Sequence, residues 1–154
     1  MANEEHVIVF QREAAQDCFA EAIPLLIEHW QEIAYIDGLT VEPEFSKYES
    51  LERNGILRTY TARLEGKLIG YAVFFLSPHL HFKKHLFAYC DVLYIMPAHR
   101  GFGHRFTRWC NNRLRDDRAS VILYNVNKKF DFGSILKRQG FKHTDDVYTL
   151  EVRS

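Results

Sequence analysis

The spacing of apolar residues predicts a strand and two helices in the first third of the chain. Residues 7–10 form a short apolar run that is typical of a strand. Across residues 23–34 the apolar side chains recur at helical spacing. Pro24 lies in this stretch, so the helix either begins one turn before it or bends there, because an internal proline removes a hydrogen bond. Pro43 suits the first turn of a second helix, which we expect to end at residues 54–55.

After the second helix the apolar pattern changes to the period of a strand. Residues 57–64 and 67–76 predict an antiparallel hairpin that is closed by the turn at Glu65 and Gly66. Residues 86–96 form the most hydrophobic strand of the chain. Because this strand is apolar on both faces, we expect it at the centre of a sheet that is covered on both sides.

The remaining pattern predicts two more helices and two more strands. We expect a helix over residues 102–115, a strand over 121–126, a short helix that ends at Gly140, and a last strand over 147–152. The whole order predicts an α/β fold, a mixed central sheet flanked by helices. In such a sheet a parallel neighbour is reached through a right-handed crossover helix.

Length and composition limit the class of protein. The chain has 154 residues with no repeat and no linker-like stretch, so we expect one domain over residues 1–154. With 47% hydrophobic residues it has enough apolar surface to fold as a globule. Twenty Lys and Arg balance twenty Asp and Glu, so no general attraction to nucleic acid or to an anionic membrane is expected.

The cysteines and the N-terminus indicate a cytoplasmic protein. Cys18, Cys90 and Cys110 are odd in number and far apart, which favours reduced thiols. Residues 1–6 are acidic and no apolar stretch follows them, so no secretory signal peptide is expected. No apolar run reaches the ~18 residues of a membrane span.

A glycine loop over residues 97–105 carries the clearest chemical signal. It lies between the central strand and an amphipathic helix, where glycines and free backbone amides can bind a phosphate group. A purely structural turn between strand and helix also favours glycine. Arg100, His104 and Arg105 add positive charge, which a turn that only connects two elements would not need.

Residues 91–103 resemble the central motif of the GNAT superfamily of acetyl-CoA-dependent N-acetyltransferases, and some segments are similar to phage and prophage members. In that family the loop pattern is Arg/Gln-x-x-Gly-x-Gly/Ala. Arg100 and Gly103 match this pattern, whereas Arg105 stands where Gly or Ala is expected. A register shifted by two residues pairs Gly101 with Gly103 but places Ala98 at the Arg/Gln position. The resemblance implies a cofactor site made of Tyr94, Ile95, Met96, Arg100, Gly101, Phe102, Gly103, His104 and Arg105.

The resemblance also implies a reaction. The chain would move the acetyl group of acetyl-CoA to an amine acceptor, a small molecule or a protein, in a ternary complex and without a metal. Main-chain groups around residues 94–96 would stabilise the oxyanion, and the pantetheine would add to the sheet like a further strand. Two alternatives stay open: a catalytically inactive GNAT-fold module that binds CoA or a protein partner, and a binder of another small molecule or nucleotide at the same anion site.

Candidate catalytic groups lie on the two strands beside the loop. Asp91 is the only carboxylate in the central strand, so burial would raise its pKa toward that of a general base, although a structural hydrogen bond would explain it too. The family's acid is often a tyrosine at a position where this chain has Leu136. Tyr124 is our first substitute and Tyr94 the second, with simple packing as the alternative for Tyr124.

Several further residues have candidate roles outside the loop and the central strand. His29 and Glu32 share one face of the first helix and could bind the acceptor, or they could lie on a solvated flank. His79, His81 and His85 suggest a metal site, but no carboxylate or thiol nearby completes a ligand set, so we expect none. Exposed aromatic side chains at strand edges could support a homodimer.

Overall fold

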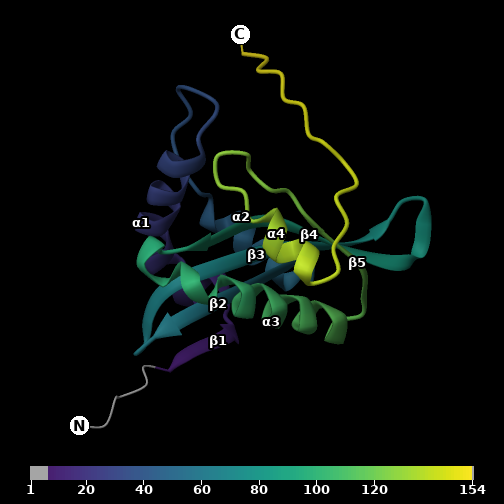
Figure 1. Ribbon diagram of the computed structural model, residues 1–154, viewed down its shortest axis with the longest axis horizontal. Helices are drawn as coiled ribbons and strands as arrows, with labels where there is room; N and C mark the ends of the chain where they lie inside the picture. The colour runs from purple at the N-terminus through teal and green to yellow at the C-terminus, as the bar shows by residue number, and fades with distance from the viewer. Residues whose placement is uncertain (1–6, 154) are drawn as a thin grey trace.

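A computed structural model describes residues 7–153 of the chain (Figure 1). In chain order the elements are β1 (Ile8–Arg12), α1 (Ala15–Ile33), α2 (Phe45–Arg53), β2 (Leu57–Leu64), β3 (Lys67–His79), β4 (Phe82–Ile95), the 3-10 helix η1 (Pro97–Phe102), α3 (Gly103–Asp116), β5 (Ala119–Tyr124) and α4 (Gly133–Arg138). Among these residues no helix has the length and apolarity needed to cross a bilayer.

The strands form one five-stranded sheet in the order β1-β2-β3-β4-β5. The first four strands are antiparallel, and β5 is parallel to β4. η1 and α3 make the crossover that a parallel pair requires. The predicted mixed sheet flanked by helices is therefore confirmed.

The turn between β2 and β3 explains the register of the first hairpin. Leu64 pairs with Lys67, which leaves a two-residue loop. Both loop residues have positive φ, 50° at Glu65 and 80° at Gly66, as a type I′ turn requires. The hairpin predicted from the strand pattern and the glycine is confirmed.

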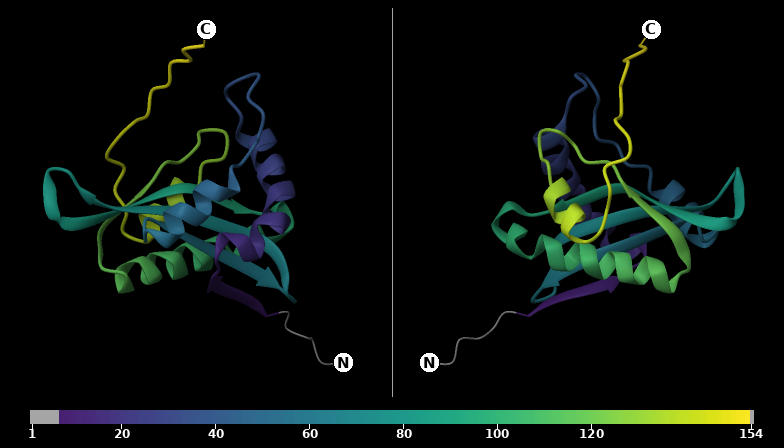
Figure 2. Two further views of the ribbon diagram at one scale, coloured as in Figure 1. Left: turned by 180° about the vertical axis from the view of Figure 1, so that it is seen from behind. Right: turned by 45° about the vertical axis from the view of Figure 1, so that its right-hand side comes forward.

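Helices cover the sheet on both faces (Figures 1 and 2). On one face α3 buries Phe106, Cys110 and Leu114, each 0% exposed, in the main core. On the other face Leu25 of α1 packs with Tyr71 and Tyr94. The helix α1 starts at Ala15 and continues past Pro24, so it extends further toward the N-terminus than the sequence pattern predicted.

The strand predicted over residues 147–152 does not form, and this prediction is wrong for the single chain. Residues 141–153 contain no helix or strand, and they run away from the sheet (Figures 1 and 2). The apolar side chains of the segment, Val147, Tyr148, Leu150 and Val152, are between 70% and 92% exposed. A strand needs a neighbour for its backbone hydrogen bonds, and within the described chain this segment has none.

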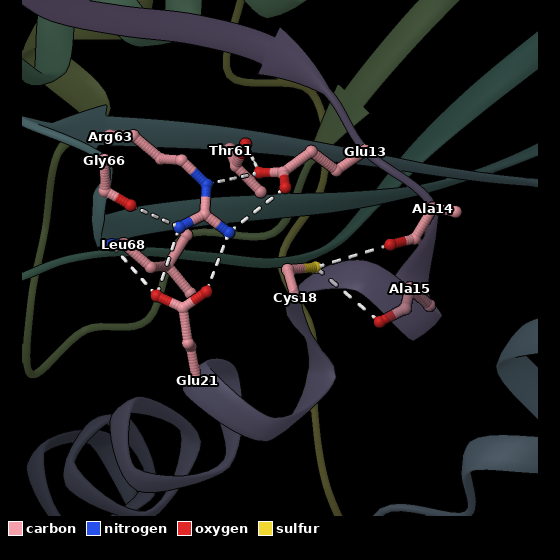
Figure 3. Close-up of polar contacts among 9 residues, drawn as sticks. All are labelled: Glu13, Ala14, Ala15, Cys18, Glu21, Thr61, Arg63, Gly66 and Leu68. Atoms are coloured by element: carbon pink, nitrogen blue, oxygen red, sulfur yellow. Dashed lines mark hydrogen bonds and ion pairs between the residues drawn. The ribbon is translucent and has the colours of Figure 1, made fainter.

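An ion cluster joins β1 and α1 to the first hairpin (Figure 3). The guanidinium of Arg63 contacts a carboxylate oxygen of Glu13 and one of Glu21, both at 2.9 Å, and Thr61 also donates to Glu13. The side chains of Arg63 and Glu13 are only 12% and 13% exposed. Burial alone would raise the pKa of Glu13, but the hydrogen bonds from Arg63 and Thr61 outweigh it and the pKa lies below its ordinary value.

Replacing Arg63 with methionine should therefore destabilise the fold. Arg63→Met leaves Glu13 partly buried without its cation, which we expect to cost about 2–4 kcal/mol at pH 7, somewhat less than breaking a fully buried pair costs. Because folding lowers the pKa of Glu13, its contribution is present above the ordinary carboxyl pKa and is lost as the pH falls through the lowered value. Urea unfolding should therefore show a smaller difference between the two proteins below a pH of about 4.

Arg113→Met is the matched control, because the exposed pair of Arg113 with Asp116 should contribute less than about 1 kcal/mol. Equal losses of stability in the two variants would contradict the structural role of Arg63.

Candidate functional site

One extra residue in β4 creates the opening in which the site lies. Val73 of β3 pairs with Val92 and Phe74 pairs with Cys90, so Asp91 is a bulge without a partner in β3. Before the bulge, Ala88 belongs to the core under α3. After it, Tyr94 belongs to the cluster under α1. The bulge therefore shifts which side chains of β4 face each layer.

The two parallel strands separate at the same position. Pairing of β4 with β5 ends at Cys90 and Tyr124. Beyond that point, the edge of β4 that faces away from β3 is not paired with any described strand. Because the outer edge of β4 is unpaired over residues 91–95, main-chain groups there are available to a ligand that adds like a strand.

A cavity of about 90 Å³ lies at this separation. It is lined by His29 and Ile33 of α1, by residues 90–93 of β4, and by four side chains of the segment that follows β5. Three parts of the chain that are distant in sequence thus meet at one opening. Its lining mixes apolar side chains with an imidazole, a carboxylate and two amides, as expected of a small-molecule site.

Asp91 lines this cavity but is less enclosed than its place in an apolar strand predicted. The bulge leaves the residue exposed. Protein atoms around it still partly desolvate the carboxylate, and this raises its pKa. The carboxylate therefore combines solvent contact with a stronger affinity for a proton than an ordinary aspartate has.

His29 and Tyr94 form a stacked pair beside the cavity. Their ring centroids lie 5.0 Å apart, and His29 is only 9% exposed, so it is not on a solvated flank. Burial lowers the pKa of His29, which keeps the ring neutral at pH 7. The hydroxyl of Tyr94 donates to Glu28 at 3.2 Å, and burial together with Glu28 raises the pKa of Tyr94.

Arg100 connects the glycine loop to the first helix. Its guanidinium binds Glu32 at 2.6 Å and donates to the main-chain oxygen of Ile95 at 3.0 Å. It also lies 4.3 Å from the ring centroid of Phe130. The sequence places Arg100 among the anion-binding residues, whereas the structure shows this side chain engaged with α1, β4 and the segment after β5.

The rest of the loop divides into a packed part and an open part. A Cβ on Gly103 would lie 3.3 Å from Cδ1 of Ile95, so this glycine allows α3 to pack closely on β4. A Cβ on Gly101 would meet nothing within 4 Å. Phe102 is buried in the core, while His104 and Arg105 are exposed. The open side of the loop is therefore bordered by basic side chains.

Tyr124 lies on the other face of the sheet from Tyr94. Its hydroxyl donates to Asn111 of α3 at 2.8 Å, and Asn111 in turn donates to Gln139 at 3.0 Å. Burial raises the pKa of Tyr124 far above its ordinary value. The structure thus does not bring Tyr124 together with Asp91. Leu136, which stands where the sequence comparison expected a tyrosine, is buried with 5% of its surface exposed.

Sequence reasoning missed the segment that closes the site after β5. Asn127 donates to the main-chain oxygen of Ile33 at 3.2 Å, and Lys129 donates to that of Ala34. These bonds satisfy carbonyl groups at the end of α1, which have no partner within the helix. The strand predicted over residues 121–126 ends two residues later than β5 does, so no local signal marked these contacts.

The three histidines near the tip of the β3–β4 hairpin have other contacts. The ring of His79 packs against Phe87 with centroids 4.4 Å apart, and His85 hydrogen-bonds Ser120 at 3.2 Å. Within residues 7–153 no group of three or more His, Cys, Asp or Glu side chains is arranged to hold a metal ion.

The model of the acetyltransferase (GNAT) family matches residues 12–104. No curated protein matches the chain at a significant level.

Several solved structures share the fold. Ribosomal-protein-alanine N-acetyltransferase from Brucella melitensis biovar Abortus 2308 is 18% identical with a TM-score of 0.66, over 96% of this chain and 99% of that one. A predicted acetyltransferase with acetyl-CoA from Clostridium acetobutylicum is 16% identical with a TM-score of 0.72, over 94% and 96%. Glucosamine-6-phosphate N-acetyltransferase from Arabidopsis thaliana is 9% identical with a TM-score of 0.72, over 96% and 99%.

Proposed function

The chain belongs to the GNAT family of acetyltransferases, and from this premise we propose that it transfers the acetyl group of acetyl-CoA directly to an amine acceptor. The observation that carries the proposal is the separation of β4 from β5 after Cys90, immediately before a glycine loop at the start of α3. An unpaired strand edge and a helix N-terminus then lie in succession along one chain. They suit the extended pantetheine and the pyrophosphate of one cofactor.

The cofactor would lie along β4 and across the open side of the loop. Of the main-chain groups at residues 94–96, the oxygen of Ile95 already accepts from Arg100, and the amide of Met96 donates to Ile69. Oxyanion donors must therefore come from the other unpaired groups of this edge. Phosphate binding would fall to amides at the start of α3, with the exposed His104 and Arg105 adding positive charge.

The acceptor would enter on the α1 side, where acidic groups gather. Asp91 of β4 lines the cavity. Glu28 binds Tyr94, which stacks on His29 of the lining, and Glu32 binds Arg100, which lies over Phe130 of the lining, so of these carboxylates only Glu32 is paired with an arginine. The remaining negative charge favours a cationic amine as acceptor. The neutral ring of His29 would form part of the wall against which the acceptor packs.

In the proposed reaction, Asp91 removes a proton from the acceptor ammonium, directly or through water. The neutral amine attacks the thioester carbon, and the C–S bond of the tetrahedral intermediate breaks to give the thiolate of CoA and an amide that still carries an extra proton on nitrogen. That proton leaves through water and restores the one that the acid gives to the thiolate. We assign the protonation of that thiolate to Tyr94, because Tyr124 lies on the opposite face with its hydroxyl held by Asn111. Release of free thiol from acetyl-CoA in the presence of a panel of amines tests the whole proposal. If the protein binds acetyl-CoA but releases no thiol with any amine, it is instead the catalytically inactive binding module.

Charge placed at Gly101 should weaken cofactor binding. Because a Cβ there meets nothing within 4 Å, Gly101→Asp and Gly101→Asn should both fold with an unchanged Tm. We expect the aspartate to raise the Kd for acetyl-CoA at least tenfold, about the value of one charge-assisted hydrogen bond, and the isosteric asparagine to change it little. Calorimetric titration measures both. If the aspartate variant binds as tightly as the wild type, the loop does not hold the pyrophosphate.

Removing the carboxylate of Asp91 should slow turnover without weakening cofactor binding. Asp91→Asn keeps the size of the side chain but cannot accept the proton, so kcat should fall by about 10²–10⁴-fold. Raising the pH should restore part of the loss, since more acceptor is then already neutral. Asp116→Asn, at the exposed end of α3 and away from the cavity, should turn over like the wild type. An Asp91→Asn protein with wild-type kcat would place the base elsewhere.

A pair of tyrosine variants distinguishes the two candidate acids. Tyr94→Phe should lower kcat at least tenfold and remove the alkaline limb of the pH profile, because the proton donor is gone. Tyr124→Phe should keep kcat and lose about 1 kcal/mol of stability with its bond to Asn111. Steady-state kinetics and urea unfolding of both proteins provide the comparison. The reverse kinetic result would identify Tyr124 as the acid.

A further inference from the structure

The C-terminal segment has the pattern of a strand but no partner in its own chain. In an extended chain, Tyr148, Leu150 and Val152 lie on one face and Val147, Thr149 and Glu151 on the other. The first three are 92%, 84% and 86% exposed. Such an apolar face is normally covered, because exposing contiguous apolar surface to water is unfavourable.

The outer edge of β5 offers the complementary surface. β5 is the last strand of the sheet, so one row of its backbone groups is unpaired within the described chain. On the face opposite α3, Val121 of β5 lies beside Phe87 of β4, and Tyr89 follows in the same row. Val121 and Tyr89 are 37% and 39% exposed. A strand added at this edge would continue the apolar row.

We propose that residues 147–152 pair as an antiparallel strand with β5 of a second copy, whose own segment pairs with β5 of the first. The exchange is isologous, so one two-fold axis covers both apolar faces and leaves no further copy to add. The proposal is independent of the acetyl-transfer reaction.

The starting point of the segment favours a second copy over the chain's own β5. Phe141 packs on Tyr124 at the end of β5, with ring centroids 5.4 Å apart. If the chain turned back along its own β5 from there, the strand would receive the polar residues 142–146. From Phe141 to Val147 the chain advances six residues, which at about 3.3 Å per residue is about 20 Å. Because β5 has only six residues, Val147 would then lie beyond the N-terminal end of β5.

The far end of the segment also lies away from its own β5. A Cβ on Gly38, in the connection between α1 and α2, would lie 3.0 Å from Nη1 of Arg153. The segment therefore ends beside the α1–α2 connection. In Figure 1 this end lies at the top of the molecule, away from the β3–β4 hairpin at the right. In this position it leaves the edge of β5 open for another copy.

Charges at the two surfaces are complementary in the antiparallel direction. Arg118 and His85 flank the start of β5, where Glu151 of the partner segment would lie. Lys128 follows the end of β5, where acidic residues Asp145 and Asp146 of the partner would lie. Opposite charges at both ends favour this direction of pairing and its register.

The oligomeric state of the full chain and two variants tests the proposal. Sedimentation velocity should show a dimer for the wild type, and Leu150→Asp should weaken dimerisation at least tenfold. Leu80→Asp is the matched control, since Leu80 is 95% exposed at the tip of the β3–β4 hairpin and outside the proposed contact. It should stay dimeric. Because both leucines are exposed, neither change should affect folding, which far-UV circular dichroism checks.

Hydrogen exchange of the wild type separates a partner copy from the chain's own sheet. Amides 148–152 should become protected as the protein concentration rises through the dimerisation range. A monomer whose amides 148–152 are protected at every concentration would show docking on its own β5 and overturn the proposal. A monomer without protection, or a dimer that Leu150→Asp leaves intact, would overturn it as well.

Discussion

The bulge at Asp91 is the feature on which the site depends. It adds one residue to β4 at the place where pairing with β5 ends. Without the extra residue, Ala88 and Tyr94 would face the same side of the sheet. Either the core under α3 would then lose Ala88, or the cluster under α1 would lose Tyr94. The same residue places a carboxylate at the opening, so the irregularity that separates the strands also supplies the group proposed as the base.

A second constraint fixes the position of the glycine loop. Arg100 binds α1 through Glu32, β4 through the oxygen of Ile95, and the segment after β5 through Phe130. Its charge is therefore largely balanced on the acceptor side. In the proposed function, cofactor phosphates would consequently be held by amides and by the exposed basic residues of the loop. Arg105, at a position where the family has glycine or alanine, belongs to that exposed set and points its charge into solvent.

Local patterns were sufficient to predict the elements that form from neighbouring residues. The type I′ turn at Glu65 and Gly66, the apolar centre of β4 and the stripe of α3 all follow from short-range spacing. The bulge at Asp91 could not be predicted, because its position depends on the register with β3. The pairs of Arg100 with Glu32 and of Tyr124 with Asn111 likewise join positions far apart in the chain. The pattern at 147–152 did indicate a strand, but a pattern does not say which chain provides the partner.

The proposed strand exchange would also affect the site, since β5 is its least supported wall. Among the described residues β5 pairs on one side only, and the segment that follows it is fixed to α1 by Asn127 and Lys129. A partner strand on the free edge would restrain β5 along its length. The opening between β4 and β5 would then have one width, set by the bulge on one side and by the partner on the other. A cofactor that adds to β4 like a strand requires such a fixed gap, because its fit depends on the distance between the two strands.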